Sequence, residues 1–108
     1  MLLKGKDTVI DSYDFSEPPR ECWLCGAEGA AEPLDRHHIF GGSYRKLSEK
    51  YKLVVYLCHY KCHLYGAFAA HNSGETMRAL RKYGQSLFCE KGGTKEQFIK
   101  IFNHNFLD

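Results

Sequence analysis

Long apolar segments are missing from the sequence. Nowhere in its 108 residues does an apolar run approach the ~20 residues that a membrane-spanning helix needs. The first ten residues, MLLKGKDTVI, lack the apolar core and small-residue cleavage site of a secretory signal peptide. Repeats and low-complexity tracts are missing too, and two independent cores would have about 50 residues each, which is marginal. We therefore expect a single soluble domain in the cytoplasm, with no membrane partner.

Cysteine and histidine, by contrast, are abundant: the chain has five cysteines and six histidines. In a secreted protein, five cysteines would suggest two disulfides and a leftover thiol. In a reducing cytoplasm disulfides are disfavoured, and metal binding becomes the leading interpretation. Four cysteines suffice for one tetrahedral zinc ion, which leaves one thiol over.

Charge is unevenly distributed along the chain, although the net charge is only +2. Residues 1–35 contain three Lys or Arg against eight Asp or Glu, a net charge of −5. Residues 36–108 contain twelve basic against five acidic residues, a net charge of +7. A basic C-terminal two-thirds is compatible with a polyanionic partner, although solvated helix faces are often rich in lysine as well.

An acidic N-terminal segment precedes the predicted core. Residues 1–20 end near the pair Pro18-Pro19, which favours an extended segment and blocks a helix there. We interpret residues 1–20 as a peripheral arm or short strand, and residues 21–108 as a single domain. Within that domain, the chemically informative motifs lie in residues 21–72, and a helical tail is predicted for residues 73–108.

Local sequence signals predict two strands followed by helices. Aromatic and β-branched residues favour strands, while a capping residue with Glu or Gln three positions later marks the start of a helix. The predicted strands are residues 34–40 and 53–57. The first predicted helix is residues 64–71, and a long helix capped by Asn72 follows and ends near Glu90. A short third helix begins at the capping box Thr94-Lys95-Glu96-Gln97. The predicted fold class is therefore α+β, with a β-hairpin unit and a helical C-terminal third.

Four of the cysteines form two close pairs. Cys22 and Cys25 have C-x2-C spacing, and Cys58 and Cys62 have C-x3-C spacing. Two such pairs can close one four-thiolate zinc site that stabilises the hairpin, although neighbouring histidines could replace a cysteine ligand. The alternative is that these thiols are simply buried as small apolar groups. The fifth cysteine, Cys89, has no predicted role.

A pair of histidines, His37-His38, lies near the end of the first predicted strand, between the two cysteine pairs. If four thiolates hold the zinc ion, the histidines are free to build a second site with His63 or His71. Neutral imidazole is both a metal ligand and a base near neutral pH. A metal-binding histidine beside one that activates water is an arrangement suited to phosphodiester hydrolysis. The alternative is a pair of surface or structural histidines.

The order of these motifs resembles HNH endonucleases, which are ββα-metal (His-Me finger) nucleases, here of the zinc-knuckle variety. The resemblance covers about residues 20–72 and is closest to small HNH proteins of phages and prophages, which would act in the cytoplasm of a bacterial host. It is carried by the C-x2-C pair, the second cysteine pair with His63 directly after it, and the stretch Asp35-Arg36-His37-His38-Ile39-Phe40-Gly41-Gly42.

This resemblance implies a zinc-stapled, treble-clef-like ββα-metal unit followed by two helices, and hydrolysis of DNA. It implies that His38 is the general base, and that His37 and His63 hold a catalytic divalent ion, Mg²⁺ or Mn²⁺, with His71 as a further candidate ligand. The structural Zn²⁺ ligands would be Cys22, Cys25, Cys58 and Cys62.

Two departures from the family pattern leave roles open. The family has an asparagine that orients the base near the start of the second strand, yet no asparagine lies near Lys52-Leu53. A backbone carbonyl could take its place, or activity could be reduced. The C-x3-C spacing also shifts His63 relative to Cys62, so the choice between His63 and His71 as second ligand stays open.

Basic and aromatic residues surround the predicted hairpin and suggest contacts with nucleic acid. Cations there would bind phosphates, and tyrosines could stack on bases. The candidate phosphate-binding residues are Arg36, Arg45, Lys46, Lys50 and Lys52, and the candidate stacking residues are Tyr44, Tyr51, Tyr56 and Tyr60. The rival interpretations are a non-catalytic zinc-stapled module that binds nucleic acid or a protein, and a regulator or inhibitor of another nuclease. A homodimer is compatible with the sequence.

Overall fold

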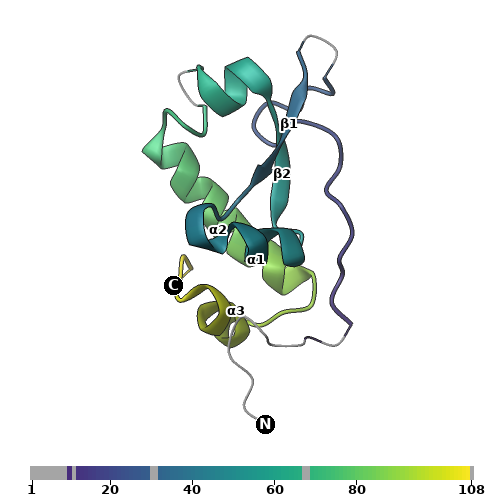
Figure 1. Ribbon diagram of the computed structural model, residues 1–108, viewed down its shortest axis with the longest axis vertical. Coiled ribbons are helices and arrows are strands. Elements are labelled where there is room, and N and C mark those ends of the chain that lie inside the picture. The colour runs from purple at the N-terminus through teal and green to yellow at the C-terminus, as the bar shows by residue number, and fades with distance from the viewer. Residues whose placement is uncertain (1–9, 11, 30–31, 67–68, 108) are drawn as a thin grey trace.

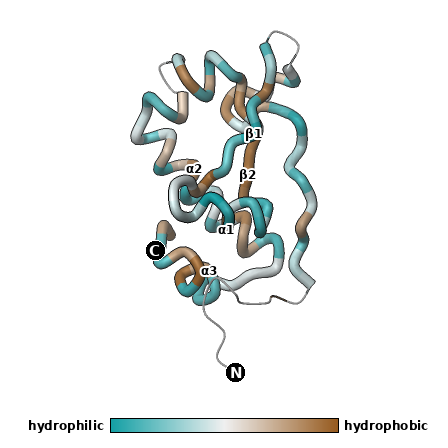
Figure 2. Tube along the Cα trace, viewed as in Figure 1, coloured by the Kyte–Doolittle hydropathy of each residue, from teal (hydrophilic) through white to brown (hydrophobic). Residues whose placement is uncertain are grey.

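Two short antiparallel strands form the sheet in this computed structural model, which describes residues 10, 12–29, 32–66 and 69–107. Strand β1 (Leu34–His38) pairs with β2 (Val54–Cys58), and His37 lies opposite Val55. All five residues of β2 are buried, whereas β1 is mostly half-buried. Figure 2 shows the matching difference in hydropathy, with β2 hydrophobic and β1 largely hydrophilic. The first α-helix contacts β1, and the third packs against the second, away from the sheet (Figure 1), so the protein is a small α+β domain, as predicted.

The connection between the strands is itself helical, which the sequence analysis did not foresee. It contains a 3₁₀ turn, η2 (Gly42–Tyr44), followed by helix α1 (Arg45–Lys50). The buried hydroxyl of Ser48 accepts a hydrogen bond from the Phe40 backbone N–H at 3.2 Å and donates to the Leu53 carbonyl at 2.5 Å. Ser48 therefore ties α1 to the end of β1 and the start of β2.

The turn after β2 lies elsewhere than predicted. Residues 64–71 were expected to be helical, but the helical segment is η3 (His59–Leu64), a single π-helical turn. Its wide i to i+5 hydrogen bonding includes the Tyr65 N–H, which donates to the Tyr60 carbonyl at 2.7 Å. Gly66 then follows in a bend, and residues 67–68 are outside the described part of the chain.

Two α-helices complete the domain: α2 (Gly74–Glu90) and α3 (Lys95–Phe102). The cap of α2 is Ser73 rather than the predicted Asn72, because the Ser73 hydroxyl accepts the Thr76 N–H at 3.1 Å. The predicted capping box at Thr94 is confirmed, with reciprocal bonds between Thr94 and Gln97. Neither these helices nor any other helix in the described residues has the length and apolar character needed to cross a bilayer.

The N-terminal segment takes part in the core at Tyr13. This side chain is buried against Tyr51 and Phe88, and its hydroxyl donates to the Tyr51 carbonyl at 2.7 Å. Residues 12–20 otherwise run in an extended conformation beside the sheet (Figure 1). Of the predicted arm of residues 1–20, residues 1–9 and 11 lie outside the described part of the chain.

Gly84 controls how closely α2 approaches the chain that leaves β1. A methyl group at Gly84 would come within 2.8 Å of the Ile39 and Phe40 side chains. Glycine in a helix interior normally lowers the stability by up to about 1 kcal/mol relative to alanine. At position 84 the steric clash of the added methyl group makes alanine the less stable residue. We predict that Gly84→Ala lowers the free energy of unfolding in urea by about 1–3 kcal/mol.

The matched control is Gly74→Ala at the start of the same helix, where the new methyl group meets only the Arg78 side chain at 3.5 Å. This variant should be as stable as the wild type or slightly more stable. Equal effects of the two substitutions would contradict the close packing of α2 on Ile39 and Phe40.

Candidate metal centres

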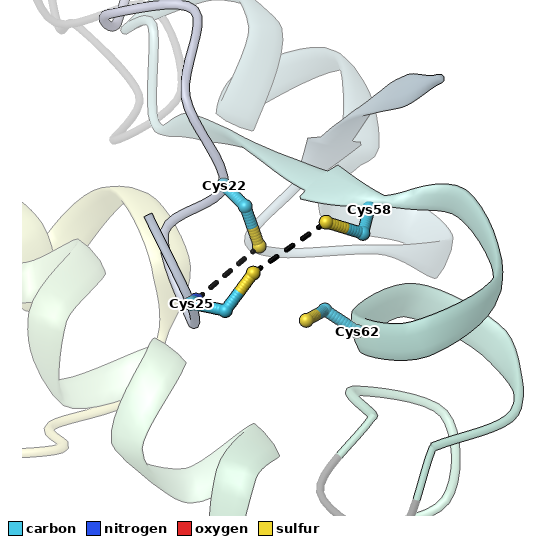
Figure 3. Close-up of side chains that lie close together, drawn as sticks. All are labelled: Cys22, Cys25, Cys58 and Cys62. Carbon is cyan, nitrogen blue, oxygen red and sulfur yellow. Dashed lines mark hydrogen bonds between the residues drawn. The ribbon is translucent and has the colours of Figure 1, made fainter. Parts of the chain in front are cut away.

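The first cysteine pair lies in a tight turn. The Gly26 N–H donates to the Cys22 carbonyl at 2.8 Å, and Gly26 adopts a φ of 80°, which suits glycine. The turn is attached to the sheet because the Trp23 N–H donates to the Tyr56 carbonyl at 2.8 Å. Cys22 and Cys25 therefore face the end of β2, as Figure 3 shows.

The second pair comes from the end of β2 and from η3. Cys58 is the last residue of β2, and the wide turn of η3 brings Cys62 to the same side, although the two are four residues apart. Sulfur atoms of all four cysteines lie within 4.8 Å of one another, and the Cys25 and Cys58 sulfurs are 3.5 Å apart. Tetrahedral zinc with Zn–S bonds of ~2.3 Å would place its sulfurs ~3.8 Å apart. The predicted convergence of these cysteines is confirmed, and the cluster could bind a structural metal ion such as zinc.

The electrostatics of the cluster couple metal binding to proton release. Burial and the neighbouring thiols raise the pKa of Cys58 to about 12 and shift the pKa of Cys62 in the same direction. Burial also opposes ionisation of Cys22, but backbone N–H donors outweigh it and lower the pKa of Cys22 to about 7. Zinc binds thiolates, so its binding must displace protons from Cys58 and Cys62 at neutral pH.

A second cluster consists of three histidines from three different segments. His37 lies on β1, His63 on η3, and His71 in the turn before α2. Their ring nitrogens lie within 4.8 Å of one another, and the Nε2 atoms of His63 and His71 are 3.1 Å apart. The structure thus brings together the three histidines that the sequence offered as metal ligands, including both His63 and His71.

The buried nitrogen of His37 fits a metal ligand. His37 is 9% exposed, and its Nε2 atom is buried with no hydrogen-bond partner in the described part of the chain. Burial, reinforced by His63 and His71, lowers the pKa of His37 to about 4, so its ring is neutral at pH 7 and keeps a lone pair. Zinc–nitrogen bonds of ~2.0–2.1 Å would place ligand nitrogens ~3.3 Å apart, which is close to the 3.1 Å between the Nε2 atoms of His63 and His71.

Asp35 orients the second histidine of this cluster. Its Oδ2 atom lies 2.7 Å from His63 Nδ1 and 2.6 Å from His59 Nδ1. A proton on His63 Nδ1 donates to this carboxylate, which leaves Nε2, the atom that lies 3.1 Å from His71 Nε2, with its lone pair free for a metal ion. The sequence analysis did not assign Asp35 a role, but strand alternation places Asp35 on the same face as His37.

His38 is separate from the three-histidine cluster. As the next residue of β1, it points to the opposite face from His37. Its Nε2 atom lies 2.9 Å from Glu49 Oε1, and its Nδ1 atom faces the Arg45 Nε–H at 3.4 Å. Glu49 comes from α1, an element that was not predicted; it lies in the stretch Ser48-Glu49-Lys50-Tyr51, which is part of the resemblance to HNH proteins, but the sequence assigned it no role.

Two of the predicted phosphate-binding residues are already paired with carboxylates. Arg36 binds Glu49 and Glu17, and Lys52 lies 3.0 Å from Glu49 and 3.1 Å from Glu17. Together with His38, these cations hold the pKa of Glu49 well below its usual range.

The remaining basic residues, Arg45, Lys46 and Lys50, are exposed on η2–α1, and Lys50 lies over the Tyr51 ring. Two predicted stacking residues, Tyr51 and Tyr56, are buried in the core, so their expected role on exposed bases is wrong. Tyr60 is exposed and Tyr44 half-buried.

Removal of one thiol tests the four-cysteine centre. Loss of a residue that only hydrogen-bonds a metal ligand typically weakens metal binding by roughly 10- to 100-fold. We predict that Cys62→Ser, which removes a ligand itself, weakens zinc binding by more than this. It should also lower the melting temperature. Zinc content and thermal unfolding measure the two effects. The control is Cys89→Ser, which removes a half-buried thiol outside the cluster and should keep the wild-type zinc content. Equal zinc content in both variants would contradict the assignment.

Comparisons with protein-family models, with curated proteins and with solved structures find no match to this chain. The function of the protein therefore has to be inferred from the chemistry of its own residues. The two clusters differ in that chemistry: one offers four thiolates in a closed set, and the other offers three imidazole nitrogens beside a polar network around His38.

Proposed function

We propose that the protein is a metal-dependent endonuclease that hydrolyses phosphodiester bonds of DNA. The observation that carries this proposal is the convergence of ring nitrogens of His37, His63 and His71, together with the buried, unpartnered Nε2 atom of His37, which is next in sequence to His38. Metal-assisted hydrolysis of a phosphodiester combines a bound metal ion with a general base, and histidine side chains can fill both roles. The resemblance of the motif order to HNH endonucleases supports the same proposal.

The number of ligands in each cluster suggests a structural role for one and a catalytic role for the other. Structural zinc sites have four protein ligands, whereas catalytic sites have three and keep a position open. His37, His63 and His71 would hold the catalytic ion, and the four cysteines the structural one. When bound, such an ion stabilises negative charge on the phosphate and on the leaving oxygen. Because imidazole suits transition metals better than Mg²⁺, the proposal favours Mn²⁺ over Mg²⁺.

His38 is the proposed general base, and Glu49 its positioning residue. The Glu49 carboxylate can accept only from a protonated Nε2 atom, so Nδ1 is left as the nitrogen that takes a proton from water. The Arg45 contact to Nδ1, at 3.4 Å, is near the limit of a hydrogen bond and is easily exchanged for a water molecule. Glu49 would thus serve in place of the asparagine that is missing from the sequence pattern.

The alternative function is a non-catalytic zinc-stapled module that binds nucleic acid or a protein. The pairing of Arg36 and Lys52 with Glu17 and Glu49 favours it, because these cations are less available to phosphates. Nucleic acid would then be bound through exposed residues such as Arg45 and Lys46.

Loss of the proposed base is the first test. We predict that His38→Ala reduces nicking of supercoiled plasmid with Mn²⁺ by about 100- to 10,000-fold, the usual contribution of general-base catalysis. The variant should keep the zinc content and the circular dichroism spectrum of the wild type, since His38 belongs to neither cluster. Undiminished nicking by a folded His38→Ala variant would remove His38 from the mechanism, and a lack of nicking by the wild type would favour the binding module.

Substitution of Glu49 separates positioning of the base from general stability. We predict that Glu49→Ala lowers kcat about 10- to 100-fold, and that Glu49→Gln recovers part of it because its amide oxygen still accepts from His38 Nε2. Glu96→Ala, at an exposed acid in the first turn of α3, is the control and should leave kcat unchanged. If Glu49 has only a structural role, its variants should change the melting temperature, but kcat should not fall from the wild type through Glu49→Gln to Glu49→Ala.

A further inference from the structure

An aromatic cavity of about 510 Å³ lies beside the proposed site. It opens between the segment that leaves β1, the N-terminal half of α2 and the chain that follows α3. Its walls include Tyr44, Phe102, His104 and Phe106, with Met77 and Arg81 contributed by α2. The volume is in the range of small-molecule binding pockets.

The wall after α3 is held in place by buried hydrogen bonds. Helix α3 ends at Asn103, whose φ of 59° turns the chain back. The fully buried amide of Gln85 then donates to Asn105 Oδ1 at 2.9 Å and accepts the Phe106 N–H at 2.6 Å. As a result the His104 and Phe106 rings stack, 5.6 Å apart, and Tyr44 lies edge-on to His104 at 5.9 Å.

A second cavity lies next to the aromatic one, and one member of the histidine cluster, His71, lines it. Its volume is about 370 Å³, and it lies at the start of α2, where its lining includes His71, Arg78 and Arg81. Met77 and Arg81 line both cavities, so the two lie next to each other along α2, and we call them together the groove. The charged lining residues of this groove are two arginines, and the described lining contains no carboxylate.

From this arrangement we infer that the aromatic cavity binds an unpaired nucleobase of the DNA strand whose phosphate lies along His71, Arg78 and Arg81. This inference rests on the proposed function, since it places the base next to the phosphate to be cleaved. It makes single-stranded or locally unpaired DNA the preferred substrate, because a base inside a duplex cannot enter a cavity.

The groove offers suitable partners for both parts of a nucleotide, the base and the phosphate. Every base has a flat π-face that stacks on aromatic side chains without regard to sequence. Arginine binds phosphate oxygens through paired N–H donors, and no carboxylate of the described lining repels the phosphate. The groove therefore predicts preference for unpaired strands together with low sequence specificity.

The test is the binding of fluorescein-labelled DNA, measured by anisotropy with zinc-loaded protein and no added Mn²⁺ or Mg²⁺. The probes are a 12-nucleotide mixed-sequence single strand and the duplex of the same sequence. We expect tighter binding of the single strand. Tyr44→Ala should weaken it by about 5- to 100-fold, the usual effect of losing one stacking partner, with little effect on the duplex.

Three further variants keep the test decisive. His104→Ala changes an exposed side chain and should weaken single-strand binding even if Tyr44→Ala does not fold. Tyr65→Ala removes a tyrosine that is 71% exposed and outside the groove, and should bind as the wild type does. Arg81→Gln should weaken binding and reduce its dependence on salt.

Unchanged single-strand binding by folded Tyr44→Ala and His104→Ala would overturn the inference, as would equal losses for single strand and duplex, or no binding of either DNA. Since the assay includes no cleavage, its result is separate from plasmid nicking. A protein that nicks plasmid but shows no effect of these variants retains the proposed function without the base site. A protein that shows the effects but never nicks retains the base site alone.

Discussion

The four-thiol cluster is the constraint on which the rest of the structure depends. A sheet of two five-residue strands is too small to be stable alone, and the polar β1 adds little apolar burial. The cluster joins the turn after the N-terminal segment to the end of β2 and to η3, and it adds to the Trp23–Tyr56 hydrogen bond that already attaches this turn to the sheet. With metal bound, the thiolates would fix the end of the sheet from which the histidine cluster is built.

The two clusters are coupled because they share η3. Cys62 and His63 are adjacent on this turn, and one belongs to each cluster. The wide π-helical turn lets residues four apart share a face, so Cys58 and Cys62 reach one cluster while His59 and His63 reach Asp35. Any change in the position of Cys62 therefore moves His63 relative to His37. The shared turn η3 therefore links the proposed structural site physically to the proposed catalytic site.

The sequence allowed prediction of features that depend on local chemistry. The α+β class, both strands to within two residues at each end, the capping box at Thr94 and the cysteine cluster all follow from spacing and propensity. Features that depend on tertiary contacts were missed. Helix α1 has no apolar stripe and is held through Ser48, so Glu49 could not be assigned to His38. Burial of Tyr51 likewise depends on Tyr13, far away in the sequence.

The central claim is that the chain has two separate metal sites, one of sulfur and one of nitrogen ligands. The most direct measurement is the number of zinc ions per chain after equilibration with Zn²⁺ and removal of the excess, for the wild type and for His37→Ala. The account predicts two ions in the wild type and one in His37→Ala, because the four thiols do not depend on the His37 side chain. One ion in both proteins, or two in both, would contradict it.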